Sequence, residues 1–276
     1  MYPLSILTFS GQKSLAAFFF VFFLSLESAA TQLVDVSLGR THLDYREYFD
    51  DAQWLRESGS GLQLTAKNEW LIREAWSLSF SVQVMNAWVN YRGKTQLGAA
   101  LDTDVLHQGR SAKLEAAYHL PLGVWSFSPV FGLSKQRYNR SIQKTSETVP
   151  VESIFDWYQL SVGAKFERHF NHSPWSLAVQ ALYVKSIAGE FELDMSAAGL
   201  ARKGAPLNAG SGSDLALAAV YQLSPSYQLS LSLKREVWRW DDSDSVQFSE
   251  PVVLTFLEPR SRKVTTSIAL SLKFQY

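Results

Sequence analysis

Cysteine is absent from this chain, and neither sign of charge is in excess. Without thiols there is no disulfide framework, no thiolate metal site and no cysteine for a lipid anchor. Lysine and arginine total 26, as do aspartate and glutamate, so the formal net charge is zero. Because nucleic-acid-binding proteins need a basic surface, this balance argues against nucleic acid as a partner.

Motifs of common catalytic and cofactor sites are missing as well. The sequence contains no G-x-S-x-G, no H-E-x-x-H and no phosphate-loop pattern. These patterns are the ones that position a serine nucleophile, a zinc ion or a nucleotide phosphate. We therefore expect neither a bound cofactor nor a metal ion.

Long hydrophobic runs are scarce. The one clear run extends from Leu15 to Leu26, after Lys13 and before small residues at 28–30. A positive region, an apolar stretch of about 7–15 residues and small residues at the cleavage site define a secretory signal peptide. A membrane anchor is the alternative, but a helix needs about 20 residues to span a bilayer. We expect residues 1–30 to be a signal peptide and 31–276 to be the exported chain.

The exported chain is rich in strict alternation of apolar and polar residues. Ten segments show this period of two, which is typical of strands and not of helices. An exported chain without a spanning helix enters a bilayer only as a closed barrel. We predict an all-β fold, a single antiparallel transmembrane β-barrel of about ten strands. One segment shows the two sets clearly: Leu62, Leu64 and Ala66 alternate with Gln63, Thr65, Lys67 and Glu69.

The connections between these segments alternate in length. Short periplasmic turns and long extracellular loops are typical of outer-membrane barrels, whereas a soluble β-sandwich, the alternative fold, has no need of such alternation. Ten strands require four short turns and five long loops, with both termini on the short-turn side. The sequence fits this count: the short connections are 70–76, 120–125, 169–175 and 223–227, and the long ones are 41–58, 91–110, 136–156, 188–212 and 236–262.

Aromatic residues gather beside the short turns. Aromatic rings suit a membrane interface because the ring is apolar and its edge is polar. We predict an interfacial girdle on the short-turn side, made up of Trp70, Trp76, Trp125, Trp175, Tyr227 and Tyr276.

The set of residues opposite the apolar one includes charges of both signs. If the apolar set faces lipid, these charges fill the interior. Ten strands lie near the eight for which side chains just fill the lumen, so we expect ion pairs in a mostly plugged interior. A narrow solute channel is the alternative. The charged set includes Asp35, Lys67, Glu69, Lys113, Glu115, Lys165, Glu167, Lys234 and Lys273.

The chain resembles the omptin-type ten-stranded barrels. The segments "VSLGRTHLDYREY" and "WYQLSVGAKFE", with "WSLAVQALYVKS" after a short turn, carry this likeness. It implies an acidic pair in the second loop facing a His–Asp pair in the fourth, which together activate a water for peptide cleavage. Asp102 and Asp104 match the acidic pair in spacing and place. The fourth loop has Asp194 but lacks the omptin histidine, so a hydrolase would need His42 or His107 instead.

The last long connection carries a third candidate. Trp238, Arg239 and Trp240 lie together, and tryptophan and arginine are enriched in binding hot spots. They predict either an exposed surface for a ligand or partner, or an outer aromatic girdle with a hairpin that extends the barrel.

Together these features predict an integral outer-membrane protein of a Gram-negative bacterium. Its surface would contact an extracellular ligand, a partner or lipopolysaccharide without catalysis; the alternatives are an omptin-like protease and a narrow channel. Its surroundings would be outer-membrane lipid and lipopolysaccharide. The final segment "SIALSLKFQY" alternates apolar residues up to the terminal Tyr276. The resemblance implies that the barrel assembly machinery recognises this strand.

Overall fold

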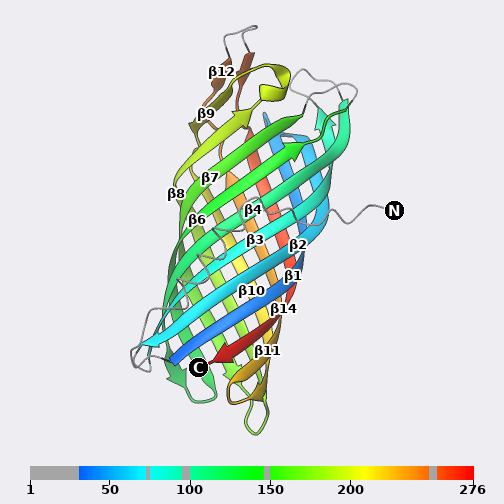
Figure 1. Ribbon diagram of the computed structural model, residues 1–276. Coiled ribbons are helices and arrows are strands. Elements are labelled where there is room, and N and C mark those ends of the chain that lie inside the picture. Colours follow the sequence, from blue (N-terminus) through cyan, green and yellow to red (C-terminus); the bar gives the residue numbers. More distant parts are fainter. Residues whose placement is uncertain (1–30, 73–74, 95–99, 146–149, 249–253) are drawn as a thin grey trace, which may run out of the picture. The chain divides into compact units, whose positions relative to one another are not determined.

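The computed structural model describes residues 31–72, 75–94, 100–145, 150–248 and 254–276. Residues 1–30, the predicted signal peptide, lie outside the described residues. The unit Thr31–Tyr276 is built on ten long, tilted strands (Figure 1). They are β1 (Thr31–Phe49), β2 (Ala52–Ile72), β3 (Trp76–Lys94), β4 (Ala100–Tyr118), β6 (Trp125–Ile142), β7 (Val151–His169), β8 (Trp175–Asp194), β10 (Gly210–Ser224), β11 (Tyr227–Trp240) and β14 (Arg260–Gln275).

These strands close into an antiparallel barrel, as predicted. Chain neighbours pair throughout, β14 pairs with β1, and β10 pairs with β8. At the closing seam Leu38 is opposite Leu270 on β14 and opposite Leu64 on β2. Closure satisfies the backbone hydrogen bonds of both edges, which a strand surrounded by lipid requires. Within the described ranges, no helix has the length and hydropathy needed to cross a membrane.

Burial follows the alternation of the sequence, with apolar side chains outward. Leu38 is 60% exposed and Leu62 is 63% exposed, values expected of a wall that lipid covers and unusual for a soluble protein. Inward residues on the same strands, such as Thr41 and Gln63, are buried. The predicted interior ion pairs are confirmed: Lys165 lies 2.7 Å from Glu167, and Lys273 lies 3.7 Å from Glu69.

The long connections differ from the prediction because the strands continue into them. β1 runs to Phe49 and β2 starts at Ala52, so most of the expected loop 41–58 is a hairpin. Asp50 and Asp51 join the two strands with φ of 47° and 64°, the left-handed backbone of a two-residue hairpin turn. The other four connections are likewise shortened by strand extensions on both sides.

Short elements cap the extended end. The hairpin β12 (Val246–Phe248) and β13 (Leu254–Phe256) follows β11, while η1 (Ser196–Ala198) and β9 (Arg202–Pro206) follow β8. In Figure 1, β9 and β12 lie at the end opposite the C-terminus. Phe248 is 1% exposed and belongs to the same buried apolar cluster as Leu43 and Trp240 on the long strands. At the short-turn end, β5 (Leu120–Leu122) pairs with β6.

Candidate functional site

A buried cluster of charged side chains fills the extracellular half of the lumen. Arg140 on β6 points inward and is 4% exposed. Its Nε lies 2.7 Å from Glu57 Oε1, and its Nη1 lies 3.0 Å from Glu47 Oε1. One guanidinium is thus shared by carboxylates from β1 and β2, and such pairing is the condition under which buried charges are tolerated.

Glu57 also contacts a histidine. His107 Nε2 lies 2.6 Å from Glu57 Oε2, and neither side chain is exposed. The two atoms are close but do not meet the geometry of a hydrogen bond. On its other side, His107 Nδ1 makes a hydrogen bond with the Tyr138 hydroxyl. The carboxylate, imidazole and phenol form a chain from β2 through β4 to β6.

A third carboxylate, that of Glu258, enters this cluster from the connection before β14. The Tyr45 hydroxyl donates a 2.6 Å hydrogen bond to Glu258 Oε1. Burial and the neighbouring Glu47 carboxylate raise the pKa of Glu258 to about 8. The Glu258 backbone N–H donates to Ser243 Oγ at 2.8 Å, which fixes the connection over the lumen.

The predicted catalytic residues are not brought together. Asp102 and Asp104 are exposed on the outer face of β4, whereas His107 is fully buried on the inner face of the same strand. Within the described residues, Asp102 accepts a 2.7 Å hydrogen bond from Asn90 and lies 3.8 Å from Arg92. An odd spacing along a strand places side chains on opposite faces, so this arrangement offers no carboxylate–imidazole pair for hydrolysis.

The expected exposed surface around Trp238 and Trp240 is not formed. The two indoles point into the lumen and are 7% and 5% exposed, while Arg239 between them points outward and is exposed. The correction follows from strand parity: Leu231 and Leu233 face outward, and therefore the even-numbered residues of β11 face inward. The indoles are neither a surface site nor an outer girdle.

The six predicted interface aromatics lie at the short-turn end. Trp76, Trp125, Trp175, Tyr227 and Tyr276 are between 46% and 60% exposed. Trp70 is partly buried. The indole of Trp76 packs on Tyr118 with ring centres 4.8 Å apart, and Arg168 lies over the Trp125 ring. Their membrane-interface role stays a prediction.

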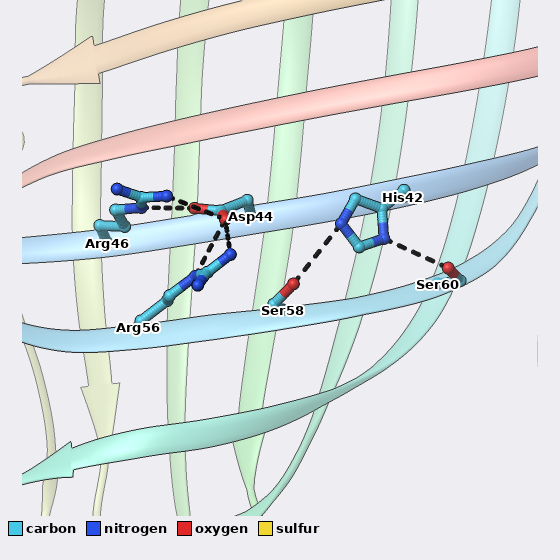
Figure 2. A network of polar contacts seen from close by, with 6 residues as sticks. All are labelled: His42, Asp44, Arg46, Arg56, Ser58 and Ser60. Carbon is cyan, nitrogen blue, oxygen red and sulfur yellow. Dashed lines mark hydrogen bonds and ion pairs between the residues drawn. The ribbon is translucent and has the colours of Figure 1, made fainter.

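A polar network covers the outer wall of β1 and β2, above the apolar band (Figure 2). Asp44 Oδ1 lies 2.7 Å from Arg46 Nε, and Asp44 Oδ2 lies 2.6 Å from Arg56 Nη2. Next to it, the His42 ring lies between the hydroxyls of Ser58 and Ser60, with His42 Nδ1 3.3 Å from Ser60 Oγ. These side chains point outward from β1 and β2. Nearer the short turns, the outward positions of the same two strands are occupied by leucines, Leu38 and Leu62.

Two of these arginines belong to a longer row. Directly opposed residues on five adjacent strands, β11, β14, β1, β2 and β3, are all arginine. Neighbouring strands lie about 4.8 Å apart, so the five side chains start from one line across the wall. The register pairs Arg239 with Arg262, Arg262 with Arg46, Arg46 with Arg56, and Arg56 with Arg92.

Only part of this positive charge is neutralised. In the described chain, Asp44 is shared by Arg46 and Arg56, and Asp102 lies beside Arg92. No ion pair of Arg239 or Arg262 is found among the described residues. Guanidinium groups bind phosphate and carboxylate in bidentate fashion, so the row offers a linear site for several anionic groups. The sequence pattern missed it because the row depends on register between strands far apart in the chain.

The fold and the lipid-facing wall define the class of this protein, an integral β-barrel of the bacterial outer membrane. The family model "Autotransporter beta-domain" matches residues 34–234. This match covers more than half of the chain, and the chain therefore belongs to that family.

Comparison with solved structures supports the fold. The outer membrane protease OmpT from Escherichia coli superposes with a TM-score of 0.61 at 10% identity, covering 92% of this chain and 99% of that chain. The translocator domain of the autotransporter NalP from Neisseria meningitidis gives a TM-score of 0.44 at 9% identity, covering 96% and 94%. A search of curated proteins found no match. At 10% identity the likeness to the outer membrane protease shows the fold alone.

Proposed function

We propose that this barrel is a non-enzymatic lipopolysaccharide-binding protein of the outer membrane, and that its outer wall is the binding surface. The observation that carries the proposal is the arginine row, five guanidinium groups at one register level on adjacent strands. Lipopolysaccharide presents phosphates and sugar carboxylates beside the barrel, and charge-assisted bidentate contacts suit both groups.

Position along the strands supports this assignment. The row Leu231, Leu270, Leu38 and Leu64 faces lipid, and the arginine row lies eight residues further along each strand. At about 3.3 Å per residue and with strands tilted by about 40°, this separation is roughly 20 Å along the membrane normal. On β14 the apolar positions continue from Leu270 to Phe274, about 10 Å nearer the short turns. Arg262 therefore stands roughly 30 Å from Phe274 along the membrane normal, which is beyond an apolar band about 25 Å tall and at the level of charged head groups.

The test is binding of labelled lipopolysaccharide to the purified chain in lipid nanodiscs. Replacing Arg92, Arg239 and Arg262 by Gln removes three charges and leaves the Asp44 network intact. We expect the affinity to fall at least tenfold and its dependence on salt to weaken, because exposed charge contacts are screened by salt. Dephosphorylated lipopolysaccharide should bind the unaltered protein as weakly as the phosphorylated form binds the variant.

The matched control replaces Arg110, Arg137 and Lys185, which are also outward cations but lie away from the row. Their replacement by Gln should change affinity less than twofold. Equal losses in both triple variants would show that net charge, and not the row, governs binding. For the non-enzymatic part, cleavage of a peptide library that is abolished by Asp102→Ala would contradict the proposal.

A further inference from the structure

A small cavity lies beside the buried cluster, in the extracellular half of the lumen. Its volume is about 70 Å³. Its walls include Tyr138, Trp157, Trp238, Trp240 and Lys263, all of them inward-facing residues. A water molecule occupies about 30 Å³ in the liquid, and a benzene-binding cavity measures about 150 Å³. The space therefore suits a solute of only a few atoms.

Three indoles meet at this cavity, and two of them have unused hydrogen-bond donors. Trp238 and Trp240 have ring centres 5.3 Å apart, and Trp157 meets Trp240 edge-on at 5.4 Å. Trp157 Nε1 donates to Gln159 Oε1 at 3.2 Å. The Nε1 atoms of Trp238 and Trp240 are buried and have no hydrogen-bond partner within the described residues. Buried indole N–H groups normally find an acceptor, so an acceptor is missing here.

Lys263 adds a positive charge that Glu236 attracts from a distance but that no carboxylate pairs at close range among the described residues. Its Nζ lies 3.9 Å from the centre of the Tyr138 ring and makes no ion pair with any described residue. Two carboxylates also line the cavity, but both are committed to another lysine: Lys234 Nζ lies 2.6 Å from Glu236 Oε1 and 3.6 Å from Asp214 Oδ2. A buried ammonium is costly unless it is paired.

We propose that this cavity is a binding site for one small monovalent anion, a halide or a planar oxyanion of nitrate size. The anion accepts hydrogen bonds from Trp238 Nε1 and Trp240 Nε1 and neutralises Lys263. A cationic ligand does not fit, because the Lys263 ammonium already occupies the aromatic faces. The site is independent of the outer wall, and its test does not depend on lipopolysaccharide binding.

The experiment is a titration of tryptophan fluorescence with bromide, on the full chain purified from outer membranes in detergent. Ionic strength is held constant with gluconate, which is too large for the cavity. Bromide quenches exposed indoles in proportion to its concentration, whereas occupation of a site gives a saturable component. We expect such a component in the unaltered protein, with chloride and nitrate competing for it.

Matched variants identify the donors. Trp238→Phe and Trp240→Phe each keep an aromatic ring but remove an unpartnered N–H, and we expect the half-saturating bromide concentration to rise at least tenfold. Trp157→Phe removes an N–H that already donates to Gln159, and it should change the half-saturating bromide concentration less than twofold. Lys263→Met should abolish saturation, and Lys263→Arg should retain it.

Heat-modifiable gel migration of each variant reports folding, and the two tryptophan variants keep the test valid if Lys263→Met fails to fold. Strictly proportional quenching in the unaltered protein would overturn the proposal and leave ordered water as the acceptor. An equal loss of bromide affinity in Trp157→Phe and Trp238→Phe would overturn the proposal as well.

Discussion

Glu57 on β2 and His107 on β4 meet inside the barrel, although β3 separates their strands, with His107 Nε2 2.6 Å from Glu57 Oε2. Arg140 on β6 binds the other oxygen of the same carboxylate. Side chains thus link strands that share no backbone ladder, at the level where the barrel rises beyond its lipid-facing band. This internal bracing explains how the strand extensions hold their shape without a bilayer around them.

Removal of Arg140 should destabilise the barrel strongly. Arg140→Leu leaves Glu47 and Glu57 buried without their cation, and breaking a buried pair costs about 3–5 kcal/mol. Urea unfolding in detergent, followed by tryptophan fluorescence, measures the loss. Arg137→Leu, on the outer face of the same strand and 4.0 Å from Asp156, should cost about 1 kcal/mol or less. Equal losses would show that the buried network does not contribute.

Stability should fall as pH rises because of Glu258. Its folded-state pKa is raised to about 8 by burial and by Glu47, above the ordinary value near 4.3. Between these values the folded chain holds a proton that the unfolded chain has lost, so folding is favoured at the acidic end and weakens up to about pH 8.

The Glu258 carboxyl also faces Tyr45, Arg140 and Glu57. These three residues are unaltered in the variant that tests the prediction. Glu258→Gln keeps the hydrogen-bonding shape without the titration. Unfolding free energies between pH 5 and 9 should lose most of their slope in this variant. Asp241→Asn, an exposed change in the same connection, should keep the slope; a slope unchanged by Glu258→Gln would refute the assignment.

A larger side chain at Gly61 should impair folding. A Cβ there would lie 1.9 Å from the Asn86 carbonyl oxygen and 2.6 Å from the Ala87 Cβ. Overpacking of this kind typically costs about 1–3 kcal/mol. Gly61→Ala should therefore lower the urea midpoint, whereas Ser60→Ala, on the outer face, should leave it nearly unchanged.

Truncation of the terminal ring should reduce assembly. If the assembly machinery recognises the final strand, Tyr276→Ala should lower the folded protein in outer membranes several-fold, measured by immunoblot of heat-modifiable bands. Tyr227→Ala removes a comparably exposed ring at the same end but leaves the C-terminus intact, and should have a smaller effect. Equal reductions would point to a general interface role of both rings.

Much of the fold is predictable from local pattern. Alternation gives the strands, their number and the lipid-facing set, because a period of two places successive side chains on opposite faces whatever the rest of the chain does. The same parity, continued from Leu233, would have placed Trp238 and Trp240 inside. The lengths of the connections differ from the prediction because the alternation is reversed outside the membrane: apolar side chains such as Leu43 and Tyr45 point inward there, and polar ones point outward.

The candidate sites, unlike the fold, could not be predicted from local sequence pattern. Composition and periodicity alone determined that the chain is an outer-membrane barrel and which residues meet lipid. Only the tertiary structure decided that His107 joins Glu57 and Tyr138, that five arginines form one row, and that Lys263 meets two unpartnered indoles. The physical reason is register: barrel closure and strand stagger bring together residues from distant segments, and no local pattern encodes which of them end up opposite one another.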